Sequence, residues 1–330
     1  MTVHDNGGMH EPPSPGDPSP MTWGAQAPAP RVASAPPGTT YDRLARTPLH
    51  RWWRPLVGTL LVAVGFVVIG VVVLLVGAIA AMIVGIPLVT DGTSITRDPL
   101  FDLAVLLLSI ALVLPVTYGV ARLVQRRPPG TLSSVAGRLR WGWLWACMAV
   151  ALVAVLLGHL ATAAAFAVTG EGTDELFGWV GWGTFAPALV ITLLLVPFQA
   201  ATEEYIFRGW VLQAFGAYLR TPWPGIVLGS AGFTALHAYT GWGVLDVFVF
   251  GLVMGWISVR TGGLEAAIAI HTLNNVLAFL VSAASGDLDE ALRQGAVPWQ
   301  SLVGTAVQLT IFTVIVVILA KSRAIQTVSR

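Results

Sequence analysis

Long apolar runs separated by short polar stretches dominate the chain from about residue 50 onward. The runs are continuous, and a helix needs about twenty apolar residues to cross the hydrocarbon core of a bilayer. A membrane β-barrel would show short segments of alternating hydrophobicity instead. The pattern predicts an all-α fold, a polytopic membrane bundle of about eight transmembrane helices. They are expected near residues 56–89, 103–123, 143–168, 185–214, 225–238, 245–259, 264–283 and 303–320.

The first 45 residues follow a different pattern, because they are rich in Pro, Gly, Ser and Ala and have no apolar period. Such a segment cannot bury enough apolar surface to fold by itself. We therefore expect residues 1–45 to be a disordered cytoplasmic tail and residues 50–325 to be the transmembrane helical domain. No basic stretch followed by an apolar core precedes Leu56, so a signal peptide is not expected.

Composition agrees with a membrane protein. Hydrophobic residues make up 55% of the 330 residues and charged residues only 11%, whereas a soluble domain carries about a quarter charged residues. The net charge of +1 gives no reason to expect a nucleic-acid partner, and the lipid bilayer is the predicted environment. The single cysteine, Cys147, excludes an internal disulfide framework.

Basic residues gather in alternate loops between the predicted helices, whereas the other loops are acidic or neutral. The positions in these basic clusters are Arg43, Arg46, Arg51, Arg54, Arg122, Arg126, Arg127, Arg138, Arg140, Arg220, Arg260, Lys321, Arg323 and Arg330. With eight helices, all of them fall on one side of the membrane. Since cytoplasmic loops carry the excess of Lys and Arg, the pattern predicts a multi-pass protein of the cell membrane with both termini cytoplasmic.

Two adjacent carboxylates, Glu203 and Glu204, lie inside the fourth predicted span. A charge at the centre of a bilayer costs about 3 kcal/mol or more, so such residues usually have a function. Glu204 and Arg208 are four residues apart, with the acid first, which is the favoured order for an ion pair on one helix face. The side chain of Glu203 points about 100° away from that of Glu204, because an α-helix has 3.6 residues per turn. A lone carboxylate in a dry cavity can act as a general base. A purely structural network of these charges is the alternative.

Further polar residues lie in the later spans. His237 is four residues after Phe233, and Asn275 is four residues after His271, so an imidazole and a carboxamide project from one helix face. Both groups can donate hydrogen bonds to a developing negative oxygen. An interhelical hydrogen bond would explain either histidine taken alone. Together with Glu203, they predict one site that handles water or protons in the cytoplasmic half of the bilayer.

Three short motifs in this order resemble the signature of the CAAX protease and bacteriocin-processing family (CPBP, also called Abi). They are Glu203-Glu204-x-x-x-Arg208, Phe233-x-x-x-His237 and His271-x-x-x-Asn275. Members of this family are intramembrane endopeptidases. The resemblance covers about residues 185–282, which we expect to be the catalytic core, and the remaining spans match only as hydrophobic helices.

The resemblance implies a role for each of these residues. Glu203 corresponds to the base that activates water, and Glu204 with Arg208 corresponds to a structural ion pair. His237 would help to hold the water, and His271 and Asn275 would bind the oxyanion. The family has been described both as metal-dependent and as metal-independent. Although the zinc motif His-Glu-x-x-His is absent, Glu203, His237 and His271 could supply three zinc ligands, so both mechanisms stay open.

The sequence and the resemblance together predict an intramembrane CAAX-type endopeptidase of the CPBP type. It would hydrolyse a peptide bond of a peptide or membrane-protein substrate near the cytoplasmic face, by a glutamate-activated water. Two alternatives use the same residues. A proton- or cation-coupled transporter would be expected to show internal repeats, which are not evident here. A non-catalytic immunity or scaffold protein would carry idle charges in the bilayer, which is costly.

Overall fold

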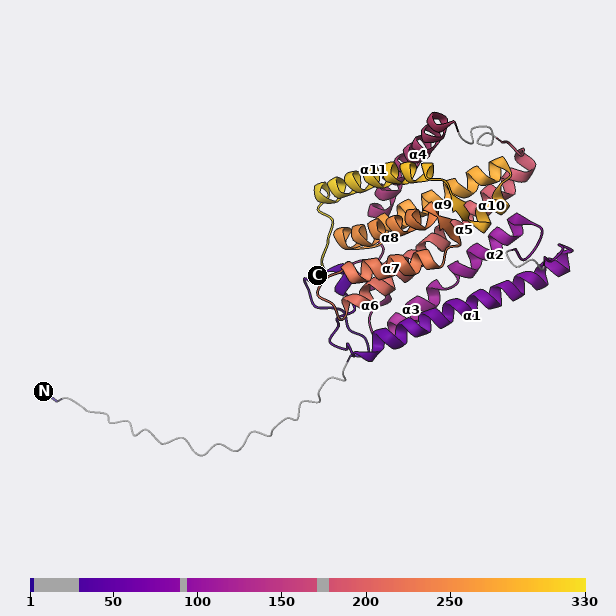
Figure 1. Cartoon of the computed structure of the whole chain (residues 1–330). Coiled ribbons are helices and arrows are strands. Elements are labelled where there is room, and N and C mark those ends of the chain that lie inside the picture. The colour runs from indigo at the N-terminus through magenta and orange to yellow at the C-terminus, as the bar shows by residue number, and fades with distance from the viewer. Residues whose placement is uncertain (3–29, 90–93, 171–177) are drawn as a thin grey trace. The chain divides into compact units, whose positions relative to one another are not determined.

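A computed structural model of the chain describes residues 1–2, 30–89, 94–170 and 178–330. The chain divides into two units, Met1–Arg31 and Val32–Arg330, and the second unit carries the helices (Figure 1). Most of the expected tail, residues 3–29, lies outside the described residues. All other statements about structure concern the second unit.

The predicted all-α membrane fold is confirmed. Within the described residues, seven helical segments are long and apolar enough to cross a membrane. They are α1 (Trp53–Val84), α2 with α3 (Pro99–Ala111 and Leu114–Leu123), α4 (Trp141–Thr169), α5 with its continuation (Trp182–Glu204, extended to Gly216), α8 (Trp242–Thr261), α9 (Glu265–Ser285) and α11 (Gln300–Ser322). Pro115 lies in the first turn of α3. The second span divides there because proline cannot donate the backbone hydrogen bond that would continue α2.

The fifth predicted span is a shorter helix, α7 (Trp223–Ala235). Its 13 residues extend over about 20 Å, which is less than the hydrocarbon thickness. It nevertheless carries the chain from the end of α6 (Leu212–Gly216) to β1 (Tyr239–Gly241). Strand β1 pairs in parallel with β2 (Gly295–Val297), which precedes α11. All eight predicted segments are therefore helical, and one of them is too short to be counted as a span by length.

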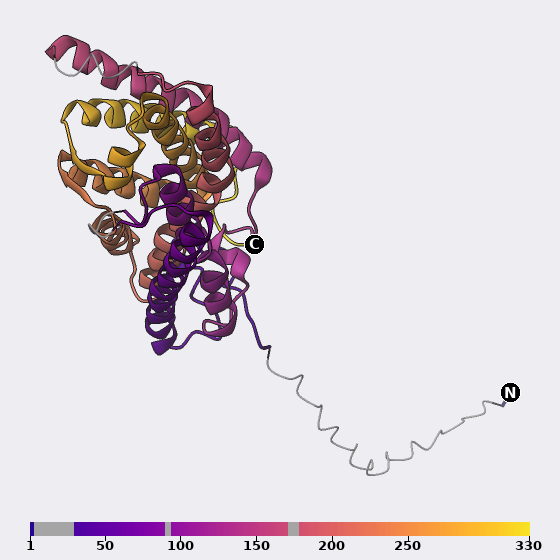
Figure 2. The same cartoon turned by 90° about the vertical axis from the view of Figure 1, so that its right-hand side faces the viewer.

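Three short elements complete the fold: the 3₁₀ helices η1 (Tyr41–Arg43) and η2 (Pro129–Leu132) and the helix α10 (Leu288–Arg293). Helix α1 lies at the side of the bundle along α2 and α3 in both views (Figures 1 and 2). Its exposed surface is lined by Leu and Val, as expected for a face toward lipid. Helix α9 is central, because it packs against α4, α5 and α8.

Small residues set the spacing between α4 and α11. A methyl group on Gly158 of α4 would come within 2.9 Å of the carbonyl oxygen of Gly304 on α11. A methyl group on Gly304 would come within 2.0 Å of the Thr162 hydroxyl. Helices in lipid gain most of their packing energy from such close approaches. The two glycines therefore allow α11 to lie directly against α4.

The chain is packed into the bundle earlier than the expected boundary at residue 45. Tyr41 and Leu44 are buried, and the Tyr41 hydroxyl donates a hydrogen bond to the Leu132 carbonyl oxygen. Arg43 and Arg46 donate to carbonyl oxygens at the end of α6 and in the turn that follows it. Within the expected tail, residues 41–45 are thus held against the helices by an apolar ring and two helix-capping arginines.

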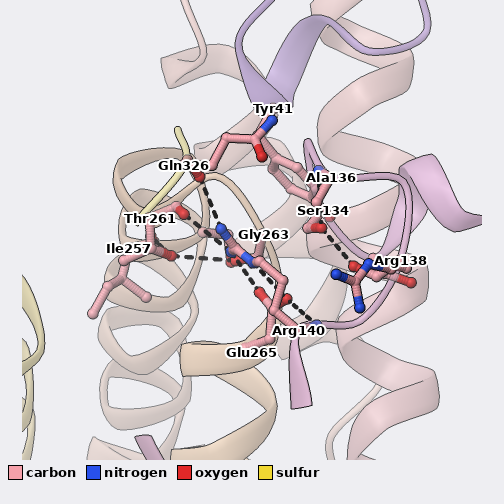
Figure 3. Close-up of polar contacts among 12 residues, drawn as sticks. Tyr41, Ser134, Ala136, Arg138, Arg140, Ile257, Thr261, Gly263, Glu265 and Gln326 are labelled. Atoms are coloured by element: carbon pink, nitrogen blue, oxygen red, sulfur yellow. Dashed lines mark hydrogen bonds and ion pairs between the residues drawn. The ribbon is translucent and has the colours of Figure 1, made fainter. Parts of the chain in front are cut away.

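An ion pair between Arg140 and Glu265 joins several loops at this end of the bundle (Figure 3). Glu265, in the first turn of α9, is fully buried, and its two carboxylate oxygens accept from Arg140 Nε and Nη2 at 2.8 and 2.7 Å. Arg140 also donates to the carbonyl oxygens of Gln326 and Thr261, at 2.8 and 3.1 Å. One side chain thereby fixes the start of α9, the end of α8 and the C-terminal segment.

Candidate active site

The helix that carries the two glutamates changes its hydrogen-bonding pattern directly after them. Helix α5 ends at Glu204, and a π-helix follows over Tyr205–Val211 before α6 begins. A π segment is wider than an α-helix and is frequent at functional sites. The sequence predicted one continuous helix over 185–214, since hydropathy does not distinguish the two types of turn. Arg208 lies within this π-helix, four residues after Glu204.

Four ionisable side chains meet between α5 and α9. The predicted ion pair is present, because Arg208 Nη1 lies 2.9 Å from Glu204 Oε1. The same oxygen lies 2.7 Å from His271 Nδ1, and the other ring nitrogen, Nε2, lies 3.3 Å from Glu203 Oε2. The His271 imidazole therefore bridges the two neighbouring carboxylates, which the sequence had assigned to separate directions.

The cluster is deeply buried and polar atoms within it remain unsatisfied. Glu203 is 8% exposed, Arg208 is 2% exposed and Glu204 is not exposed. Within the described part of the chain, Glu203 Oε2, Glu204 Oε2 and Arg208 Nη2 have no hydrogen-bond partner. A buried carboxylate oxygen without a donor is costly unless a ligand or water binds it. Glu203 is thus able to accept a hydrogen bond from a polar molecule entering the site.

The charges of the cluster can be counted. A carboxylate only accepts, so His271 Nδ1 must carry the hydrogen in its bond to Glu204. Arg208 offsets the charge of one carboxylate, and buried clusters are stable only near electroneutrality. Neutrality then requires one further proton, which either Glu203 or His271 Nε2 carries. The two neighbouring atoms that can bear that proton, Glu203 Oε2 and His271 Nε2, lie 3.3 Å apart.

Aromatic rings enclose the charges. The Arg208 guanidinium lies 4.3 Å from the centre of the Phe233 ring, a distance typical of a cation–π contact. The rings of Phe233 and Phe250 approach His271 edge-on, at 5.7 and 5.6 Å between centroids. On α8, a methyl group added to Gly251 would lie 3.2 Å from Arg208 Nη2. These apolar contacts lower the local dielectric constant and strengthen the electrostatic interactions inside.

Asn275 lies one helical turn after His271 on α9. Its Nδ2 donates to Gln199 Oε1 at 3.3 Å, and Gln199 lies one turn before Glu203 on α5. Helices α5 and α9 are therefore connected at two neighbouring levels, by His271 with Glu203 and Glu204 and by Asn275 with Gln199. This brings Asn275 beside the charge cluster, as the one-turn spacing along each helix requires.

His237 is placed differently from the other candidates. It lies in the turn after α7, and its Nδ1 donates to the Phe233 carbonyl oxygen at 2.8 Å. Its ring is 4.5 Å from that of Phe233, which also contacts His271. Phe233 therefore connects the two histidines through apolar contacts.

The proposed zinc ligands do not form a metal site in this structure. Among the described residues, no group of three or more His, Cys, Asp or Glu side chains is arranged to hold a metal ion. Glu203 contacts His271, whereas no contact of His237 with either of these two described residues is found, although its bond to backbone through Nδ1 leaves Nε2 as a potential ligand. Because the three side chains are not grouped around one point, the donor set of Glu203, His237 and His271 does not fit a metal as arranged, and we derive no step through one.

Sequence reasoning missed several residues that contact the site. Phe250 and Gly251 of α8 touch His271 and Arg208, and Gln308 of α11 reaches α9 through Asn274. None of them stands at a helical spacing from the three motifs. Their proximity arises from packing between helices, and a pattern within one helix carries no information about it.

Comparisons with known proteins identify the family of the region that carries these residues. Residues 182–277 match the family model described as "Type II CAAX prenyl endopeptidase Rce1-like". The chain is 25% identical to the uncharacterized protein YyaK of Bacillus subtilis (strain 168) over 227 residues, which are 66% of this chain and 73% of YyaK.

The chain is also 33% identical to an uncharacterized 24.3 kDa protein of Escherichia coli over 155 residues, which are 44% of this chain and 67% of that protein. No solved structure matches. The matched region contains all three motifs and the whole charge cluster. The chain therefore belongs to the CPBP family of CAAX-type intramembrane endopeptidases.

Proposed function

We propose that Glu203 activates a water molecule that hydrolyses a peptide bond within the bilayer. The contact between Glu203 and His271, with Glu203 Oε2 free of any hydrogen bond among the described residues, carries this proposal. It pairs a base with an adjacent proton donor. The family match supports hydrolysis rather than the transporter or immunity alternatives. The residues assigned to the site are Glu203, Glu204, Arg208, His237, His271 and Asn275.

The reaction follows from the proximity of Glu203 Oε2 and His271 Nε2, which lie 3.3 Å apart. With the proton on His271, Glu203 is ionised and removes a proton from water. The hydroxide oxygen bonds to the carbonyl carbon of the substrate, and the carbonyl oxygen becomes an oxyanion. His271 Nε2–H and an Asn275 N–H donate to that oxyanion. The C–N bond then breaks, and the proton held by Glu203 passes to the departing amine.

The other residues hold this arrangement. Glu204 orients His271 through Nδ1, and Arg208 keeps Glu204 ionised. His237 carries its Nδ1 hydrogen toward the backbone, so its Nε2 is an acceptor for a water that enters beside Phe233. His271 lies six residues after the start of α9, about 9 Å along the helix from the end that carries most of the basic side chains. We assign this end to the cytoplasm, together with both chain termini.

The test uses purified protein in lipid nanodiscs and two substrate sources. One is a farnesylated peptide ending in Cys-aliphatic-aliphatic-X, with a fluorophore and a quencher on either side of the scissile bond. The other is a detergent extract of membrane proteins, analysed by mass spectrometry for newly formed N-termini. We expect cleavage by the wild type in at least one assay and a fall of about 1,000-fold or more with Glu203→Gln, because no base remains.

Asp246→Asn is the matched control, since Asp246 is a partly buried carboxylate of α8 outside the cluster. It should leave the cleavage rate within about twofold of the wild type. Full activity of Glu203→Gln in a folded protein would remove Glu203 from the role of base. Absence of any cleavage by the wild type in both assays would overturn the proposed activity.

A further inference from the structure

Four amide side chains form a continuous chain of hydrogen bonds across three helices beside the site; those of Gln199 and Gln308 are buried and those of Asn274 and Asn275 are partly buried. Gln308 Nε2 of α11 donates to Asn274 Oδ1 at 3.1 Å. Asn274 Nδ2 donates to Asn275 Oδ1 at 3.5 Å, and Asn275 Nδ2 donates to Gln199 Oε1 at 3.3 Å. Every donor points in the same direction, from α11 through α9 to α5.

This common direction determines how the Asn275 carboxamide is oriented. Its oxygen accepts from Asn274 and its nitrogen donates to Gln199, so the opposite orientation would bring two oxygens together at one end and two NH₂ groups at the other. Hydrogen-bonded chains strengthen one another in a low dielectric, and mismatched amides are costly there. Nδ2 has two hydrogens and Gln199 takes one. The second remains available to a substrate oxygen.

Gln308, the first donor of this chain of hydrogen bonds, lies outside the region that matches the family model, residues 182–277. Gln308 is 4% exposed and lies beside Gly158, at a close approach of α11 to α4. A methyl group on Gly158 would come within 2.8 Å of Gln308 Cβ, so the absence of a side chain at 158 gives Gln308 its position. The packing of α11 on α4 is thereby linked to the orientation of an amide in the site.

We infer that Gln199, Asn274 and Gln308 are positioning residues that hold the Asn275 N–H toward the oxyanion. This inference rests on the proposed function, because it assumes that Asn275 binds the oxyanion. Without this chain of hydrogen bonds, the Asn275 amide can turn and present its oxygen, which repels the developing negative charge. The effect belongs to the transition state, so kcat should fall while KM changes little.

The experiment is a double-mutant cycle on the full-length protein in nanodiscs. Gln199→Met and Gln308→Met remove one end of the chain each and keep a similar volume. Each is made in the wild type and in Asn275→Ala. The probe is the farnesylated peptide or, if that is not cleaved, the peptide spanning the most abundant Glu203-dependent cleavage in the extract. Gln300→Met is the matched control, since Gln300 is a buried amide two turns earlier on α11.

We expect Gln199→Met to lower kcat about tenfold, less than the roughly 100-fold or greater loss from removing an oxyanion donor outright. Gln308→Met should cause a smaller fall of at least about threefold. In the Asn275→Ala background, each should cost less than about twofold more, because the group that they orient is gone. Gln300→Met should leave kcat within about twofold in both backgrounds.

Losses that are the same in both backgrounds, or that Gln300→Met reproduces, would mean a structural role and would overturn the inference. Unchanged kcat in Gln199→Met and Gln308→Met would overturn it as well. In all of these cases the proposed function survives if Glu203→Gln and Asn275→Ala each lower kcat strongly. Full activity of Asn275→Ala would remove Asn275 from the oxyanion site, and full activity of Glu203→Gln would count against the proposed function itself.

Discussion

Arg208 and Glu204 form an ion pair that is almost completely removed from solvent, with side chains 2% and 0% exposed. Removing one partner leaves an uncompensated buried charge, which costs about 3–5 kcal/mol. We therefore expect Arg208→Met to lower the midpoint of thermal unfolding strongly. The double variant Arg208→Met/Glu204→Gln should recover most of the loss, because the unpaired charge is gone. Unfolding in detergent, followed by intrinsic fluorescence, measures both.

Arg293 and Asp289 provide the comparison within the same molecule, because they are also four residues apart but 54% and 44% exposed. Exposed pairs contribute about 0–1 kcal/mol. Arg293→Met and the double variant with Asp289→Asn should therefore leave the midpoint nearly unchanged. If Arg208→Met and Arg293→Met lower the midpoint of thermal unfolding equally, burial does not explain how the Arg208 pair contributes to stability.

At the scale of single residues, the sequence predicted what one helix determines. The four-residue spacing of Glu204 and Arg208 was enough to predict their ion pair, which is present. It could not predict that His271 touches both glutamates, because that contact depends on how α9 is rotated against α5. The placement of His237 in a turn, bonded to backbone, was also beyond a spacing argument.

Among the elements, the approach of α11 to α4 depends on glycine. A methyl group on Gly158 would lie 2.8 Å from Gln308 Cβ and 2.9 Å from the Gly304 carbonyl oxygen, closer than atoms can pack. Gly158→Ala should therefore separate the helices and destabilise the protein by about 1–3 kcal/mol. Because Gln308 would move with α11, kcat of the cleavage reaction should fall too.

Gly142 is the matched control, since it lies in the same helix and a methyl group there would meet nothing within 4 Å. Gly142→Ala should be neutral or stabilise by up to about 1 kcal/mol, because alanine favours helix. The midpoint of thermal unfolding and the cleavage rate are measured for both variants. Equal effects of the two substitutions would show that close packing at Gly158 is unimportant.

The helices themselves were predictable because hydropathy records length and apolar content. All eight predicted segments are helical, and the weakest of them, near 225–238, is the 13-residue α7. The π-helix over Tyr205–Val211 and the interruption between α2 and α3 were not predicted. A π turn and an α turn can have the same composition, so hydropathy does not distinguish them. For the interruption between α2 and α3, Pro115 was a local indication in the sequence.

For the molecule as a whole, one arginine holds segments that are far apart in the chain. Arg140 binds Glu265 at the start of α9, Thr261 at the end of α8 and Gln326 near the C-terminus (Figure 3). Helix α9 also carries His271 and Asn275. The positions of His271 and Asn275 within the bundle thus depend on a contact at its end, about 9 Å from His271 along the helix.

Arg140→Met should therefore release two regions at once. Glu265 would be left buried without its partner, which costs about 3–5 kcal/mol, and the Gln326 carbonyl oxygen would lose its donor. We expect a lower midpoint of thermal unfolding and faster hydrogen–deuterium exchange in residues 322–330 and in the first turn of α9. Arg138→Met, an exposed arginine two residues earlier, should change neither. Faster exchange confined to α9, with residues 322–330 unchanged, would mean that other contacts hold the C-terminal segment, among them the pairing of Ser329 with Gly38 and Thr39.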